Sequence, residues 1–161
     1  MATYTPQGID FADTAPVIAE RSGTIAASRE QVWSAICDHE HWPEWMVALK
    51  SCRPTSTPPS GVGSTRVVTL AGGVSFHEEF IAWDEPEVWA FTGTSGPGIF
   101  QSLVERVTLT EVDPGRTQIT YRMAIAPRRG LGPLVKLARG GIEKNLGKAL
   151  EELDRWVAAH G

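Results

Sequence analysis

The last thirty residues of the chain carry one long amphipathic pattern, which limits the possible folds more than any other feature. From Leu131 to His160, apolar residues recur at steps of three and four and therefore share one face of a helix. They are Leu134, Val135, Ala138, Ile142, Leu146, Ala149, Leu150, Leu153, Trp156 and Val157. A helix of about 30 residues is about 45 Å long. Its apolar face needs a broad cover, and we expect a curved sheet to supply it.

The composition is typical of one globular domain. The 161 residues are 42% hydrophobic and 21% charged, which allows a sizeable core. No apolar run approaches the roughly 20 residues of a membrane span, and the N-terminal sequence has no secretory-signal pattern. We therefore expect a cytoplasmic protein without a membrane span. The net charge of −4 argues against a nucleic-acid binder. Cys37 and Cys52 lack a CxxC spacing and are expected to be free thiols.

The start of the chain divides into an arm and the beginning of a domain. Residues 1–18 mix Thr, Pro, Gly and Asp without periodicity, and we expect a loosely structured N-terminal arm there. Residues 19–161 are expected to form a single domain. Within it, Glu20–Ala27 is predicted to be the first strand.

Two short helices are predicted after this strand. Ser28 and Gln31 have the spacing of a capping box, which predicts a helix from Arg29 to Asp38. A second short helix is expected over residues 39–46, interrupted near Pro43.

From Ala48 onward the apolar pattern changes to a period of two, which indicates strands. Six more strands are predicted, at about residues 48–54, 64–71, 74–84, 87–94, 100–112 and 116–126. Gly, Pro and Asp clusters separate them, and such short links favour antiparallel hairpins. The predicted order is strand, two helices, six strands and a long helix.

This order and several local sequences resemble the START-related superfamily, in particular its polyketide cyclase/dehydrase branch. The matching segments are Ser28–Trp33, Asp38 with Trp42–Trp45, Trp83–Pro86 and Gly115–Thr117. The resemblance implies an α+β helix-grip fold, with a seven-stranded antiparallel sheet curved around the C-terminal helix. It also implies a deep apolar cavity between sheet and helix.

The alternation along the predicted strands indicates which polar side chains share a face with apolar ones. Glu78 shares its face with Phe76 and Phe80, Glu105 with Leu103 and Val107, and Tyr121 with Ile119 and Met123. A carboxyl group among aromatic rings has a raised pKa, and this suits it to proton transfer. We therefore predict catalytic roles for Glu78, Glu105 and Tyr121. The predicted ligand-binding residues are Phe76, Phe80, Trp89, Gln101, Leu103, Val107, Ile119, Met123, Leu134, Ile142 and Leu146.

Structural alternatives exist for the same residues. Glu78 could instead lie at a strand end near solvent or pair with Arg66 or Arg106 across the sheet, and a β-bulge could turn the predicted face outward. His39 and His41 are expected to be a surface pair, because residues two apart on a helix do not face one site. No metal site is predicted.

The chain from Arg128 to Arg139 is basic and contains no Asp or Glu. This stretch could attract an anionic ligand group, or it could be ordinary solvated surface. Gly140 and Gly141 weaken the long helix and could mark a gate for a ligand.

Three functions remain open at this point. The chain could carry or sequester a hydrophobic small molecule such as a polyketide, a lipid or a quinone-like compound. It could be a cyclase or dehydratase that uses Glu78, Glu105 and Tyr121 without a cofactor. The third possibility is a module that binds a protein partner. A monomer or a homodimer would serve each of these roles.

Overall fold

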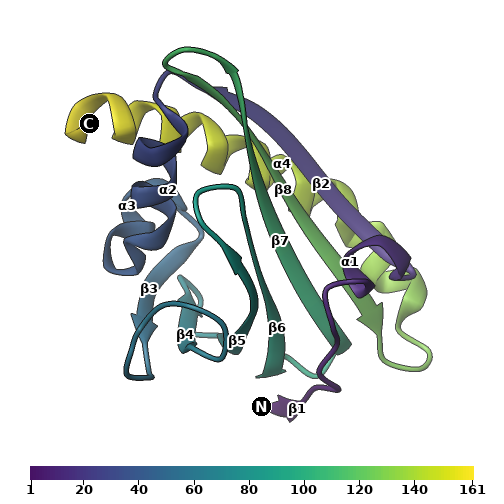
Figure 1. Ribbon diagram of the computed structural model, residues 1–161. Coiled ribbons are helices and arrows are strands. Elements are labelled where there is room, and N and C mark those ends of the chain that lie inside the picture. Colours follow the sequence, from purple (N-terminus) through teal and green to yellow (C-terminus); the bar gives the residue numbers. More distant parts are fainter.

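A computed structural model describes residues 1–161 and shows an antiparallel sheet curved against one long helix (Figure 1). In chain order the elements are β1 (Ala2–Thr3), α1 (Phe11–Thr14), β2 (Val17–Ile25), α2 (Arg29–Cys37), η1 (His39–His41), α3 (Trp42–Trp45), β3 (Leu49–Pro54), β4 (Thr65–Leu70), β5 (Ser75–Asp84), β6 (Val88–Gly96), β7 (Phe100–Asp113), β8 (Arg116–Pro127) and α4 (Gly132–His160). The main sheet has the order β2-β8-β7-β6-β5-β4-β3. The predicted helix-grip fold with seven antiparallel strands is confirmed.

The predicted C-terminal helix is confirmed as α4, which runs beside β2 and β8 (Figure 1). Its second half is buried through Leu146, Leu150, Leu153 and neighbouring residues. In its first half only Val135 is buried, and it packs into a cluster with Tyr4, Phe100 and other residues. Successive residues of a helix point about 100° apart. The helix therefore turns Leu134 away from the sheet, where it is 52% exposed.

α4 is continuous through Gly140 and Gly141. A Cβ atom added at either glycine would meet nothing within 4 Å. Packing therefore does not require glycine at these two positions, and the gate stays a prediction.

The two short helices after the first strand are confirmed, and their local sequences explain them. The Ser28 side chain accepts a hydrogen bond from the Gln31 backbone, and the Gln31 side chain accepts one from the Ser28 backbone, which closes a capping box at the start of α2. Beyond α2, η1 and α3 bury Trp42 and Trp45 at the end of the sheet.

The N-terminal arm, expected to be loose, holds two ordered elements. β7 pairs with β6 only along Val88–Thr92, and the arm fills the space where these strands separate. There β1 pairs with the end of β6, and Tyr4 is buried beside Gly93, where a Cβ atom would lie 2.9 Å from its ring. α1 buries Ala12 on the far face of the sheet, against β7 and β8. These elements are too short to show a period in the sequence.

The main core lies between the concave face of the sheet, the helices α2 and α3, and the second half of α4. All six tryptophans contribute to it or pack against it, and Trp42, Trp45 and Trp89 are among the largest fully buried side chains. No helix is long and apolar enough to span a membrane.

We expect Leu153→Ala to lower the free energy of unfolding by about 2–5 kcal/mol, because it leaves a cavity at a fully buried position of α4. Leu137→Ala is the matched control on the same helix, since Leu137 is 83% exposed. Its effect should stay within about 0.5 kcal/mol. Urea unfolding of both variants measures the difference, and equal effects would contradict the assignment of the buried face.

Candidate ligand-binding cavity

A cavity of about 260 Å³ lies between the concave face of the sheet and the middle of α4. Thirteen of its seventeen lining residues are hydrophobic, and the lining comes from α3, the segment after it, β3 to β8 and α4. The lining residues are Trp42, Met46, Ala48, Leu49, Arg66, Val68, Leu70, Phe76, Glu78, Phe91, Phe100, Glu105, Tyr121, Met123, Ile142, Asn145 and Leu146.

Half of the residues predicted for the site meet in this cavity. They come from three strands and from α4, and those on the strands lie on the face that alternation indicated. They are Glu78, Glu105, Tyr121, Phe76, Met123, Ile142 and Leu146.

Six other predicted residues do not line the cavity. Phe80, Trp89, Val107 and Ile119 face inward but are packed in the main core, and Leu103 is packed against Tyr4 and Phe100. Leu134 is exposed on α4. Alternation reports the face of a strand, but it does not tell whether a neighbouring side chain already fills the space in front of it.

Gln101 does not lie on the predicted face, because a β-bulge changes the register of β7 beside it. The register between β7 and β8 shifts between Phe100 and Ser102, so that Gln101 has no direct partner on β8. Such an irregularity reverses the faces of the residues before it. Phe100 therefore lines the cavity, whereas Gln101 is exposed and donates a hydrogen bond to Thr5.

The lining of the cavity contains a buried ion pair, Arg66 and Glu78. Arg66 Nε donates to Glu78 Oε2 over 2.6 Å, and the two side chains are 1% and 5% exposed. This is the pairing that the sequence left open as an alternative for Glu78. Burial raises the pKa of Glu78, and the charge and hydrogen bond of Arg66 act against this rise. Burial works against the Arg66 cation, but the negative charge and hydrogen bond of Glu78, together with Cys52 and Tyr121, act in the opposite direction, and the pKa of Arg66 is raised.

Four aromatic rings surround the Arg66 guanidinium. Its central carbon lies 4.3 Å from the ring centre of Trp42 and 4.7 Å from that of Phe91, with Phe80 and Trp89 at 5.1 and 5.5 Å. Cation–π attraction is strongest when the cation is desolvated. The aromatic cluster therefore replaces part of the hydration that Arg66 loses in the interior.

His39 is another hydrogen-bond partner of Arg66. It is buried and therefore does not form the expected surface pair with His41. It is 5% exposed, and its Nδ1 lies 3.0 Å from an Arg66 terminal nitrogen. Arginine has no acceptor, so Nδ1 accepts the hydrogen bond. Burial and the charge of Arg66 lower the pKa of His39 to about 3, so the ring is neutral and carries its proton on Nε2. His41 is exposed and pairs with Asp38.

Glu105 and Tyr121 form a second polar pair beside the first. The Tyr121 hydroxyl donates a short hydrogen bond to Glu105 Oε2, and both residues are buried. Burial and then the charge of Glu78 raise the pKa of Glu105 to about 8, while the Tyr121 bond and Arg66 act in the opposite direction. Burial and Glu105 raise the pKa of Tyr121 well above its ordinary value. Near pH 7, the cavity thus presents a carboxylic acid and a phenol.

Arg66 is the functional candidate that the sequence reading missed. It alternates with Val68 and Leu70 along β4, so the argument applied to Glu78 would have placed it inside as well. No group of three or more His, Cys, Asp or Glu side chains is arranged to hold a metal ion.

We expect the stability of the protein to depend on the protonation of Glu105. Between pH 4.5 and about pH 8, the folded state holds this proton and the unfolded chain releases it. The resulting stabilisation is complete below pH 4.5 and is lost as the pH rises through about 8. The Glu105→Gln variant has no carboxyl group to titrate at this position. The free energy of unfolding of the wild type should therefore fall by a few kcal/mol relative to that of the variant between pH 4.5 and about pH 8. Urea unfolding at a series of pH values checks this, and parallel profiles would contradict it.

The overall structure is similar to several solved structures. An aromatase/cyclase from a Streptomyces species aligns with a TM-score of 0.75 and 14% identity, over 88% of this chain and 93% of that one. A START superfamily protein from Mycobacterium smegmatis aligns with a TM-score of 0.72 and 20% identity, over 87% of this chain and 98% of that one. Norcoclaurine synthase from Thalictrum flavum aligns with a TM-score of 0.70 and 14% identity, over 100% of this chain and 98% of that one. That structure is a complex with dopamine and hydroxybenzaldehyde. At these identities the similarity shows the fold.

Sequence comparison identifies the family. An uncharacterised protein of Mycobacterium tuberculosis is 28% identical over 156 residues, which cover 94% of this chain and 91% of that protein. The family model described as polyketide cyclase / dehydrase and lipid transport matches residues 16–157. This match spans nearly the whole domain, and the chain therefore belongs to the polyketide cyclase/dehydrase and lipid transport family.

Proposed function

We propose that the protein binds a neutral, mainly apolar small molecule, with a carbonyl oxygen of the ligand beside the buried polar groups of the cavity. The observation that carries this proposal is an apolar cavity lined by one cluster of neighbouring buried polar groups, Arg66, Glu78, Glu105 and Tyr121. Sites of this kind hold the body of a ligand by hydrophobic burial and fix its orientation with a few polar contacts. A polyketide fragment, a lipid with a carbonyl group and a quinone all have this character.

The hydrogen-bonding groups of the cavity favour a ligand that carries a hydrogen-bond acceptor. The bonds to Glu78 and His39 use two of the five N–H donors of Arg66, and further N–H groups of the same guanidinium are available to a ligand. Protonated Glu105 accepts from Tyr121 on one oxygen and can donate from the other. A carbonyl oxygen beside these groups would accept from both residues.

The charges of the cavity favour a neutral ligand. The positive charge of Arg66 and the negative charge of Glu78 cancel. Burial and the charge of Glu78 raise the pKa of Glu105 to about 8 and so keep this carboxyl group neutral. An anionic ligand would add an uncompensated charge to a site where desolvation of ions is costly.

The volume of the cavity favours a small ligand. An engineered cavity of about 150 Å³ holds one benzene molecule, so 260 Å³ has room for about two fused rings. The hydroxybenzaldehyde bound to norcoclaurine synthase is itself a small aromatic carbonyl compound, on the same fold.

We expect acetylnaphthalene, a two-ring ketone, to bind more tightly than naphthalene, which lacks the acceptor. Naphthoate should bind more weakly than both because of its charge. The gain from the carbonyl group should be about fivefold to tenfold, the value of one good hydrogen bond. Isothermal titration calorimetry measures all three affinities. Tighter binding of naphthoate than of the ketone would overturn the neutral-ligand proposal.

A matched pair of variants tests whether these probes enter the cavity. Ile142→Trp places a larger side chain in the lining and should abolish binding of acetylnaphthalene. Leu137→Trp adds the same ring system at an exposed position of the same helix and should leave binding unchanged. Equal affinities in the two variants would show that the probe binds elsewhere.

A second candidate function is proton transfer to and from the bound carbonyl compound. Its support is the arrangement of two buried carboxyl groups with different partners. Glu105 can donate its proton to the carbonyl oxygen while Glu78 Oε1, which makes no hydrogen bond, removes a proton from the adjacent carbon. The product is an enol, and reversal of both transfers restores the ketone. Enolisation of this kind is a step in cyclase and dehydratase chemistry.

Exchange of the methyl protons of acetylnaphthalene in D₂O tests this second function by NMR. Wild type should accelerate the exchange, and Glu105→Gln should lower the catalysed rate by about 100-fold or more. Binding should persist, because the Gln amide still donates to the carbonyl oxygen. Glu78→Gln is a poor probe, since it leaves Arg66 buried without its counter-ion. Undiminished exchange with Glu105→Gln would exclude Glu105 as the acid.

A further inference from the structure

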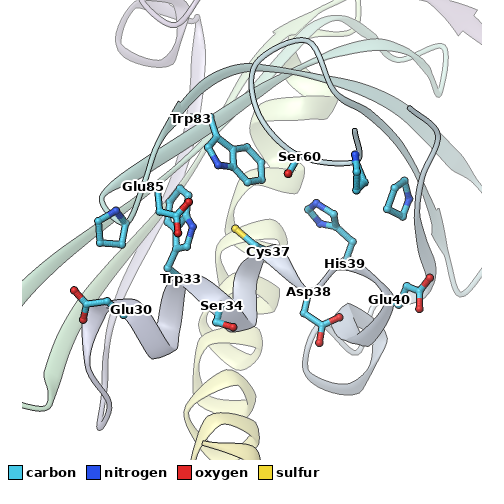
Figure 2. A pocket seen from close by; sticks show the side chains of 13 residues that line it. Glu30, Trp33, Ser34, Cys37, Asp38, His39, Glu40, Ser60, Trp83 and Glu85 are labelled. Carbon is cyan, nitrogen blue, oxygen red and sulfur yellow. The ribbon is translucent and has the colours of Figure 1, made fainter. Parts of the chain in front are cut away.

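A second hollow lies outside the sheet–helix cavity and shares no lining residue with it. It is a groove of about 790 Å³ between α2, η1, the segment after β3 and the turn between β5 and β6. Figure 2 shows Trp33, Cys37 and His39 directed from the helical side toward Trp83 and Ser60 on the opposite side. Pro54, Pro59 and Pro86 also line the groove.

The groove has an excess of negative charge. Its lining includes Glu30, Asp38, Glu40 and Glu85 but no Lys or Arg. Asp38 pairs with His41, whereas the three glutamates make no ion pair. The pKa of the Cys37 thiol is raised to about 12. The main cause is the burial of Cys37, and the second is the negative charge of the nearby Glu85. A bound cation would meet unpaired carboxylates here.

Two indole rings stand at the same end of the groove as Glu85 (Figure 2). The ring centres of Trp33 and Trp83 are 5.6 Å apart and the rings are nearly perpendicular, at 82°. Trp is the side chain that attracts a cation most strongly through its ring face. The carboxylate and the two indoles together favour an organic ammonium ion over a hydrated metal ion.

His39 supplies an independent sign of a missing ligand. It lines the groove and is only 5% exposed, and its Nε2 atom has no hydrogen-bond partner. Because Arg66 donates to Nδ1, the neutral ring carries its hydrogen on Nε2. A buried N–H without an acceptor costs about 1–3 kcal/mol. An oxygen atom of a ligand in the groove would satisfy it.

We propose that this groove binds an organic ammonium ion that also carries a hydroxyl or carbonyl oxygen. The ammonium group lies against Trp33, Trp83 and Glu85. The oxygen accepts a hydrogen bond from His39 Nε2. This site is separate from the cavity, and its ligand is a cation rather than a neutral apolar molecule.

Choline is a suitable probe because it combines a quaternary ammonium group with a hydroxyl group. The indole N–H signals of Trp33 and Trp83 in a heteronuclear NMR spectrum should shift on titration and reach saturation. Dimethylbutanol, the neutral carbon isostere of choline, should cause no such shift. Absence of a saturable shift with choline, or equal affinity for the neutral isostere, would overturn the site. Tetramethylammonium should bind more weakly than choline, and equal binding of the two would overturn the contact with His39.

Two charge variants complete the experiment. Glu85→Gln removes a carboxylate of the groove and should weaken choline binding by about fivefold. Glu79→Gln makes the same charge change at an exposed position outside the groove and should have no effect. Equal weakening by both variants would show that choline responds only to the overall charge. Glu85 does not line the cavity, so Glu85→Gln should leave acetylnaphthalene binding unchanged, and the choline result is independent of the proposed function of the cavity.

Discussion

The structure depends on the burial of one cation. Arg66 is 1% exposed, on the strand next to the edge of the sheet, and is surrounded mainly by aromatic side chains. It is held by Glu78 from β5, by His39 from η1 and by the rings of Trp42, Phe91, Phe80 and Trp89. Removing one partner of such a pair leaves a charge in the interior, at a cost of about 3–5 kcal/mol. In addition to the apolar core, the guanidinium group of Arg66 therefore links the short helices η1 and α3 to the strands β5 and β6.

The same cation determines the state of the cavity. Arg66 keeps Glu78 as its counter-ion, and the charge of Glu78 then adds to burial in raising the pKa of Glu105 to about 8. One positive charge can compensate only one of two neighbouring carboxylates. The second carboxyl group stays protonated and becomes a hydrogen-bond donor. A site with two glutamates and one arginine is thus neutral overall, and this neutrality is the reason to expect an uncharged ligand.

The sequence predicted the periodic parts of this structure and missed the parts that depend on contacts distant in the chain. The long helix, the capping box at Ser28 and the alternation around Glu78 and Tyr121 are local signals, and each reappears in the structure. The bulge beside Gln101 leaves no local signal, so the faces at the start of β7 were reversed. The burial of His39 depends on Arg66, which is 27 residues away in the sequence. Isolated polar residues such as these can be placed only when the folded partners are known.

The link between Arg66 and His39 also relates the two hollows of the molecule. Arg66 lines the cavity, His39 lines the groove, and their hydrogen bond crosses the wall between them. Because Arg66 can only donate, it makes His39 Nδ1 an acceptor and Nε2 a donor. The charge inside the cavity therefore decides the hydrogen-bonding character of the groove outside it. A ligand oxygen on His39 would in turn polarise the ring and strengthen the acceptor that Arg66 uses. Occupation of the groove would thus stabilise the cation on which the cluster of buried polar groups in the cavity is built.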